Sequence, residues 1–417
     1  MSYYPADQGD VMTKRRGLLM LQGFGIVWLA ASPVSAQDKP PVFKTGVELV
    51  TVDAQVVDKK GTPIPALRPE QFQVSIDGKR RTVVSAELVD ANTGLPFPAT
   101  GPAPAAPADA TRPPVATPTP NIYVLAVDQG SFRAVNAPSV IYAAREFLKR
   151  ALPNDYVGMV SFPAPGVVVN PTRNRAELET AIPRLVGFSA IKQLRKYQYT
   201  LADAIDVAAR DARATQAVVQ RNCQPNDLMC GRDVENELTE TVSILEMQSA
   251  RSLAGIRDVI ASIKGIPGRK TLVVLSAGIP SGDRTGGRLY MRNDAVQGGK
   301  EAADAGILLY TLHLNSAFLD SFSPDAPSAQ QTAMREANVY AKGLETFNGT
   351  AGGTFMEVST GPDFAIARMM LETSAYYLLG VEVQDADRDG KTHRIQVKVD
   401  HKNSSVRSRP TFVIPKK

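Results

Sequence analysis

The run Ile122-Tyr-Val-Leu-Ala-Val127, which leads directly into Asp128, decides the fold. It is apolar or aromatic throughout, as in a strand buried on both faces, whereas a strand with one wet face alternates. Similar short runs, such as Thr271–Leu275, alternate along the chain with stretches of helical spacing, such as Val140–Ala151. Strands that alternate with helices predict a mostly parallel sheet with helices on both faces. We therefore assign residues 121–375 to a Rossmann-like α/β domain.

Further elements of this domain follow from the same patterns. The expected strands are Tyr156–Phe162, Val167–Val169 and Ile307–Leu312. The expected helices are Ala176–Leu185, Leu201–Val219 and Glu235–Lys264.

The α/β domain is flanked by β structure on both sides. The expected strands are Val47–Val57, Phe72–Ile76 and Thr82–Val89 before it, and Tyr376–Val383, His393–Val399 and Thr411–Ile414 after it. The segments 42–90 and 376–417 are each too small to form a stable sandwich alone. We expect them to pair into one β-sandwich-like domain with the α/β domain inserted. Residues 91–120, rich in Pro, Ala and Thr, are expected to be an extended linker.

The first 36 residues have the pattern of an export signal. Lys14–Arg16 is a basic segment, and Gly17–Ala31 is a mostly apolar run that is shorter than the roughly 20 residues of a spanning helix. Val34-Ser-Ala36 supplies the small residues of a cleavage site. We expect cleavage after Ala36, no membrane span afterwards, and a secreted or periplasmic protein. An uncleaved anchor is the alternative, and Thr13–Leu19 leaves both the general and the twin-arginine export route open.

Charge and cysteine content narrow the function classes. The chain of 417 residues has 47 basic and 42 acidic side chains, a net charge of +5, and basic runs no longer than triplets, which argues against nucleic acid as a partner. Its only cysteines are Cys223 and Cys230. After export, a disulfide that closes a short loop is the natural interpretation. A metal site is disfavoured because no nearby His or Cys completes a four-ligand set.

Several segments, in this order, resemble von Willebrand factor A (VWA) domains. They are the strand ending in Asp128, Asp155–Phe162, Tyr199–Ile205, Arg269–Gly278 and Ala351–Thr354. The flanks Val47–Val57, 67–78, 376–380 and 389–397 resemble the acidobacterial-type VWA-related proteins. The resemblance covers most of the chain after the export signal. It implies a binding protein rather than an enzyme. It also places the site beyond the carboxyl ends of the first and fourth α/β strands, where the strand order reverses.

The resemblance implies a metal-ion-dependent adhesion site of pattern Asp-x-Ser-x-Ser with a distant Thr and Asp. Asp128 matches the first position and Thr200 the threonine. Gly130 and Phe132 stand where the two serines belong, and Ala277 stands where the last aspartate belongs. A single carboxylate is a poor ligand set for Mg²⁺. We therefore expect no tightly bound cofactor, and Mg²⁺ is the alternative that the site type implies.

Other polar residues near these positions complete the candidate binding site. Ser131 and Ser276 could supply hydroxyls by a local shift, and Asp203 or Asp283 could approach. Without a metal, Asp128 would accept hydrogen bonds from loop amides or hydroxyls, and Thr200 would cap the helix that follows it. The binding residues predicted from sequence are therefore Asp128, Ser131, Thr200 and Ser276.

The enzymatic alternative is a periplasmic hydrolase of Ser-Lys type, because Ser189 and Lys192 fit the Ser-x-x-Lys pattern of penicillin-binding proteins and serine β-lactamases. The companion motifs of that class are absent from the chain, so we interpret the match as coincidence. The expected function is binding of a protein or envelope partner, whose identity the sequence does not give, through loops at the carboxyl edge of the sheet. A purely structural envelope role is the third hypothesis.

Overall fold

A computed structural model describes most of the chain after the N-terminal segment. The described residues are 49–91, 93, 121–163, 166–189, 196–282, 288–315, 330–358, 361–409 and 411–416. The predicted export signal, most of the predicted linker, Lys192 and Asp283 lie outside them.

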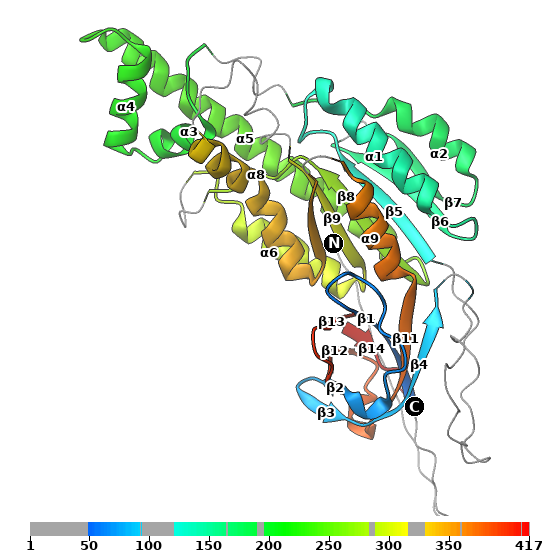
Figure 1. Ribbon diagram of the computed structural model, residues 1–417. Helices are drawn as coiled ribbons and strands as arrows, with labels where there is room; N and C mark the ends of the chain where they lie inside the picture. The colour runs from blue at the N-terminus through cyan, green and yellow to red at the C-terminus, as the bar shows by residue number, and fades with distance from the viewer. Residues whose placement is uncertain are drawn as a thin grey trace, which may run out of the picture. The chain divides into compact units, whose positions relative to one another are not determined.

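A six-stranded sheet with strand order β10-β9-β8-β5-β6-β7 forms the centre of the α/β part (Figure 1). Its strands are β5 (Asn121–Asp128), β6 (Tyr156–Phe162), β7 (Val168–Thr172), β8 (Arg269–Ser276), β9 (Leu308–Leu314) and β10 (Thr354–Val358). All neighbouring pairs are parallel except β6 and β7. The order reverses between β5 and β8, which makes their carboxyl ends the switch point of an open sheet. The α/β fold class predicted from the sequence is confirmed.

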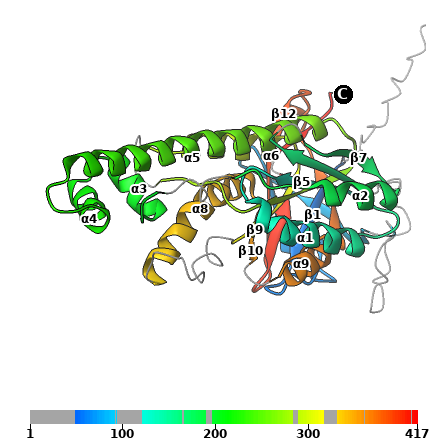
Figure 2. The same cartoon turned by 90° about the horizontal axis from the view of Figure 1, so that it is seen from above.

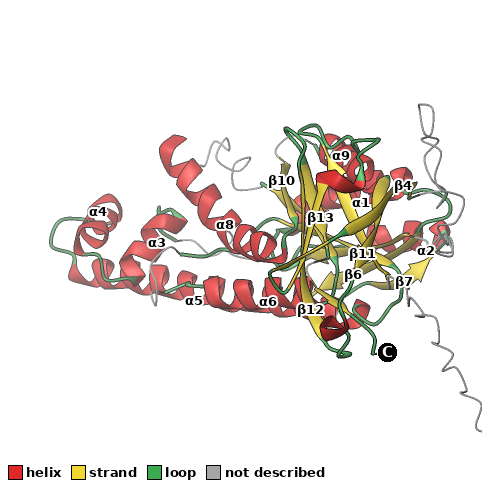
Figure 3. Cartoon of the chain, turned by 90° about the horizontal axis from the view of Figure 1, so that it is seen from below, coloured by secondary structure: helices red, strands yellow, loops and turns green. Residues whose placement is uncertain are grey.

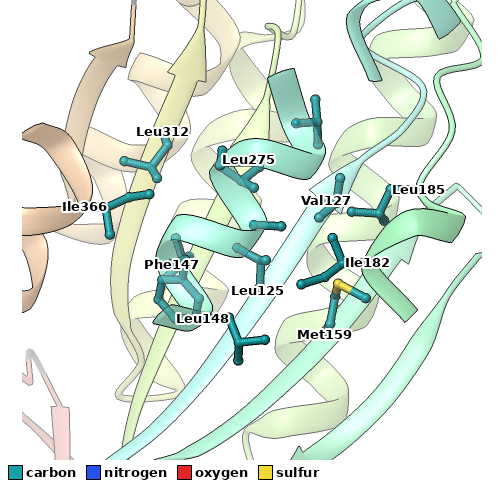
Figure 4. Packing of buried hydrophobic residues seen from close by; sticks show 14 of the residues in the cluster. Leu125, Val127, Phe147, Leu148, Met159, Ile182, Leu185, Leu275, Leu312 and Ile366 are labelled. Atoms are coloured by element: carbon teal, nitrogen blue, oxygen red, sulfur yellow. The ribbon is translucent and has the colours of Figure 1, made fainter. Parts of the chain in front are cut away.

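Strand β5 is buried along its whole length because helices cover both faces of the sheet. Leu125 and Val127 pack into one cluster, together with α1 (Ala137–Arg150), α2 (Arg175–Ala181) and α9 (Asp363–Thr373). Figure 4 shows this cluster, in which Phe147 and Ile366 approach the strands from the helices. Val124 and Ala126 face the other cluster.

The opposite face of the sheet is covered by three helices, α5 (Leu228–Ile263), α6 (Arg292–Asp304) and α8 (Gln330–Ala351). Leu253 and Ile256 of α5 are fully buried against this face, as is Phe347 of α8. Among the helices of the described ranges, none is both long and apolar enough to cross a membrane.

The amino-terminal half of α5 forms a helical extension with α3 (Leu201–Ala208) and α4 (Ala212–Asn222). In Figure 2, α5 runs well past the sheet and carries both short helices near its end. The single helix expected over Leu201–Val219 is wrong: Arg210 has a φ of +61°, and Asp211 caps a new helix by accepting from the next backbone amides. The long helix begins at Leu228, earlier than expected, because Asp227 caps it.

A disulfide joins the end of α4 to the start of α5. The Cα atoms of Cys223 and Cys230 are 5.8 Å apart, and the two residues are seven positions apart in sequence. The predicted pairing of the two cysteines is confirmed.

Two antiparallel sheets complete the described fold, with orders β13-β1-β11-β4 and β14-β12-β2-β3 (Figure 3). Their strands are β1 (Leu49–Val57), β2 (Phe72–Ile76), β3 (Lys79–Arg81), β4 (Val83–Asp90), β11 (Ala375–Glu382), β12 (Thr392–Val399), β13 (Ser405–Ser408) and β14 (Thr411–Val413). Each sheet therefore combines strands from both ends of the chain. Alternate residues of β1, β2, β11 and β12 share one hydrophobic core. Strand β13 was not expected from the sequence.

A buried carboxylate connects the antiparallel sheets to the α/β part. Glu372 of α9 has no exposed surface and binds Arg407 of β13. The same carboxylate accepts from the hydroxyl of Tyr310 at 3.0 Å and from Nε of Arg368 at 2.9 Å. A buried charge is tolerated when it is paired and hydrogen-bonded, as Glu372 is here.

Candidate functional site

Asp128 lies at the carboxyl end of β5, at the switch point of the sheet. It has no exposed surface, and both of its carboxylate oxygens accept hydrogen bonds from hydroxyls. Ser252 of α5 donates to Oδ1 at 2.9 Å, and Ser276 at the end of β8 donates to Oδ2 at 2.9 Å. The carboxylate is therefore held between the strand next to it and the helix that covers the sheet.

Ser131 ties the loop after β5 to the end of β8. Its hydroxyl donates to the backbone carbonyl of Asp128 at 2.7 Å and accepts from the amide of Ala277 at 2.8 Å. The hydroxyl of Ser276 also accepts from the amide of Gly278 at 3.1 Å. We call Asp128, Ser131, Ser252 and Ser276 the Asp128 cage. It fixes the starts of two adjacent loops at the edge of the sheet.

Burial raises the pKa of Asp128 from 3.8 to about 7, although the hydroxyls of Ser276 and Ser252 oppose this increase. Desolvation disfavours the charged carboxylate, and no Lys or Arg in the described chain is hydrogen-bonded to it to offset that cost. Near neutral pH the carboxyl group therefore exists in both protonation states.

Thr200 is the N-cap of α3. Its hydroxyl accepts from the amide of Asp203 at 3.1 Å, and the carboxylate of Asp203 accepts from the amide of Thr200 at 2.9 Å. Arg221 also pairs with Asp203 at 3.1 Å. Within the described residues, no hydrogen bond joins Thr200 or Asp203 to the Asp128 cage. The structure thus connects three of the four residues predicted from sequence and places Thr200 in a capping box.

The three departures from the adhesion-site pattern have clear structural roles. Phe132 is 2% exposed and packs in the core beside α1. A Cβ at Gly130 would lie 3.1 Å from Cδ of Pro163 and 3.4 Å from Oδ1 of Asp128, so a side chain there would press against Pro163 and contact the carboxylate. Ala277 is buried and contributes only its backbone amide to the cage.

The residues present do not fit a tight divalent-cation site. Both oxygens of Asp128 are engaged by hydroxyl protons, and Asp203 is committed to its cap. In the part of the chain that the structure describes, no group of three or more His, Cys, Asp or Glu side chains could hold a metal. Mg²⁺ prefers several oxygen ligands in octahedral geometry, and one carboxylate supplies few of them.

Two residues of this region were missed by sequence reasoning. Ser252 lies on the buried face of α5, one helical turn from Ser249, and both serines interrupt a stripe that is otherwise apolar from Val242 to Ile263. That interruption is the signal that could have identified Ser252. His313 pairs with Ser276 in the β8–β9 register and is 1% exposed. Burial lowers its pKa, and the charge of Glu357 and the backbone of Ala277 oppose this decrease.

Ser189, the nucleophile of the enzymatic alternative, donates its backbone amide to the carbonyl of Phe132 at 3.0 Å. The proposed partner Lys192 lies outside the described residues. His393 lies between Asp77 and Asp389, which raise its pKa, in the turn regions of the antiparallel sheets.

No family model and no curated protein matches the sequence. The sheet itself decides the fold: five strands are parallel, the sixth is an antiparallel edge strand, and the order reverses between the first and fourth strands, as the sequence resemblance implied. The α/β part has the VWA fold. Among solved structures, a von Willebrand factor type A protein from Catenulispora acidiphila is similar at 9% identity and a TM-score of 0.34, over 89% of this chain and 74% of that one.

Two further solved structures are similar. An aerotolerance-related membrane protein from Bacteroides fragilis aligns at 13% identity and a TM-score of 0.30, over 60% of this chain and 98% of that one. Manganese-loaded TRAP protein from Plasmodium vivax aligns at 9% identity and a TM-score of 0.30, over 80% of this chain and 98% of that one. Likenesses this low do not bear on the function or metal content of this chain.

Proposed function

We propose that this chain is an exported binding protein that contacts a protein partner through the loops at the carboxyl edge of its VWA-fold sheet. In this proposal the contact needs no tightly held cation, and the Asp128 cage positions the loops rather than contacting the partner.

The observation that carries the proposal is a set of exposed apolar side chains on two loops that are joined at this edge. Val135 is 68% exposed, Val186 is 44% exposed and Phe188 is 52% exposed. The amide of Phe188 donates to the carbonyl of Gln129 at 2.9 Å, and the amide of Val186 donates to Oε1 of the same Gln129 at 2.9 Å.

These contacts place the apolar side chains on a rigid base. The glycine between Val186 and Phe188 lies so close to the loop after β5 that a Cβ there would be 2.5 Å from the backbone of Phe132 and Arg133. The buried hydroxyl of Ser131, in the loop after β5, accepts from the amide of Ala277 and so ties this loop to the end of β8. A rigid display of exposed apolar groups favours binding because little conformational freedom is lost when a partner docks.

Photocrosslinking in cells that export the protein tests this proposal. A photoreactive phenylalanine analogue at position 188 should give a discrete protein adduct, whereas the same analogue at position 84 should not. Val84 lies on β4 and is 48% exposed, which makes it a control of matched exposure and apolar character.

Substitutions should then reproduce the result. Phe188→Ser should weaken capture of the crosslinked partner about 30-fold, the scale of one apolar hot spot, and Val84→Ser should leave it unchanged. Equal adducts from positions 84 and 188, or capture that survives Phe188→Ser, would contradict the proposal. Circular dichroism of each variant separates a lost contact from a lost fold.

Export is tested separately by intact-mass analysis of the protein recovered from the periplasm or medium. A mature N-terminus at Gln37 supports cleavage after Ala36, whereas retention of residues 1–36 supports the uncleaved anchor.

A further inference from the structure

A second polar cluster lies where the antiparallel sheets meet the amino-terminal edge of the α/β sheet. Alternate residues of β1 face the sandwich core, so Asp53 and Gln55 point the other way. They line a cavity of 40 Å³ whose other walls come from the first residues of β8 and β9 and from the end of the β13 segment. Because the Asp128 cage lies at the carboxyl end of β8, the two sites are at opposite ends of the same strand.

The wall of this cavity is rich in positive charge. Its lining includes four basic side chains and one carboxylate, namely Arg269, Lys270, Arg407, Arg409 and Asp53. Arg409 pairs with Asp53 at 3.1 Å, and Arg407 pairs with Glu372. Nζ of Lys270 donates to the carbonyl of Ile266 at 2.8 Å. The basic side chains therefore exceed the carboxylates that neutralise them.

Two buried polar groups in the wall have no hydrogen-bond partner within the described residues. Gln55 is 3% exposed, and neither Nε2 nor Oε1 of its amide is paired. Nη1 of Arg269 is likewise buried and unpaired, while its guanidinium lies over the ring of Tyr376 at 3.7 Å. Each unpaired group of this kind costs about 1–3 kcal/mol. Native structures rarely leave such groups unpaired without a reason.

The register of the sheet brings these groups together. Gln55 of β1 lies directly opposite Arg407 of β13. Lys270 and Arg409 line the same cavity, and burial, together with the positive charge of Arg409, lowers the pKa of Lys270. Several donors thus surround one small space, and an added negative charge there would relieve the repulsion among them.

We propose that this cavity binds a small oxyanion, with Nε2 of Gln55 and Nη1 of Arg269 as donors. About 10–15 Å³ suffices for one water, so 40 Å³ accepts an ion of a few heavy atoms but no large ligand. The shared chemistry is that of phosphate, sulfate and carboxylate groups. The excess of basic side chains favours such an ion over neutral water molecules. The site is independent of the binding function proposed above.

Calorimetry on the purified full chain tests the proposal with three probes, inorganic phosphate, sulfate and acetate, each against chloride at equal ionic strength. At least one probe should bind with a dissociation constant of about 1 mM or below. Phosphate or sulfate binding without acetate binding would assign a tetrahedral anion, and acetate binding alone would assign a carboxylate.

Variants locate the binding. Gln55→Leu and Arg269→Met should each weaken binding of the same probe about tenfold or more, the scale of one lost charge-assisted hydrogen bond. Arg213→Met, which removes an exposed positive charge on α4, should leave binding unchanged and controls for general electrostatics.

Two binding results would overturn the proposal: no heat from any probe beyond the chloride blank, or equal binding by wild type and Gln55→Leu. Since leucine removes an unpaired amide, Gln55→Leu should also fold without any anion and with an unfolding midpoint at least as high as that of wild type. Both midpoints are measured in buffer without phosphate, sulfate or acetate, where a lower midpoint for Gln55→Leu would show that the amide has a partner without any anion, against the proposal.

Discussion

Replacement of Asp128 by asparagine should stabilise the protein at pH 8 and leave its stability almost unchanged at pH 4. Burial raises the pKa of this carboxyl from its ordinary value of 3.8 to about 7. Between these two values the unfolded chain has released the proton that the folded protein still holds. The free energy of unfolding therefore falls as the pH rises from about 4 to about 7, and it stops falling above the folded pKa.

The size of the effect follows from the two pKa values. They are about three pH units apart, and each unit corresponds to about 1.4 kcal/mol, so the carboxylate destabilises the folded state by about 4 kcal/mol at pH 8. Asparagine has nearly the same shape and no charge, and its amide can still bond to the hydroxyls of Ser252 and Ser276. The variant should therefore gain up to about 4 kcal/mol over wild type as the pH rises.

Urea unfolding followed by circular dichroism, at one-unit steps from about pH 4 to pH 8, measures the difference between the two proteins. Every other titrating group is common to both, so its contribution cancels in the difference. Asp304→Asn, an equivalent change at an exposed position in α6, is the control and should give no comparable trend. A constant difference between Asp128→Asn and wild type over the whole range would refute the account of Asp128 as a buried carboxyl caged by hydroxyls.

Three further predictions concern metal, the buried ion pair and the disulfide. Calorimetry with Mg²⁺ or Mn²⁺ should show no binding at micromolar concentration, and a micromolar dissociation constant would contradict the conclusion that the residues around Asp128 do not fit a tight cation site. Arg407→Met should lower the free energy of unfolding by about 1.5–3 kcal/mol because the buried Glu372 loses one of its two cationic partners and keeps Arg368, whereas Arg145→Met, at an exposed pair, should cost less than about 1 kcal/mol; equal losses in urea titrations would argue against a buried ion pair. Reduction, or Cys223→Ser with Cys230→Ser, should cost about 2–3 kcal/mol for so short a loop, and an unchanged urea midpoint would mean that the cross-link does not constrain the unfolded chain.

The arrangement of the α/β sheet could be predicted because its signals are local and strong. A run such as Ile122–Val127 can be buried on both faces only inside a layered α/β fold, and the alternation of strands and helices then limits the topology. The break between α3 and α4 was missed because the apolar periodicity continues across it. Asp211 lies at this break and is favoured as the N-cap of α4 rather than inside a helix, a preference that the apolar periodicity does not show.

The sites were harder to predict because they depend on contacts between distant segments. Asp128 and Ser276 could be predicted because each ends a strand of the same sheet. Ser252 is 124 positions from Asp128 in sequence, and whether its side chain points to Asp128 depends on the helical phase of α5. The cavity beside Gln55 depends on the pairing of β1 with β13, a strand of four residues without a clear signal of its own. No pattern within either segment predicts which face of β1 meets the basic residues.

The way the two ends of the chain meet has a consequence for the order of folding. The backbone amide of Leu67 donates a hydrogen bond to the hydroxyl of Tyr377, 310 positions later. The antiparallel sheets can therefore form only after residues as late as Tyr377 have been synthesised. The VWA-fold part between them can fold first, and its two ends are joined by the hydrogen bond between the hydroxyls of Tyr123 and Thr373, 250 positions apart. Once this part has folded, the flanking strands start from neighbouring points, and the entropy of closing so long a loop no longer opposes their pairing. The part that folds early thus brings the flanking strands close together. We expect their pairing to be a slow, late step in refolding.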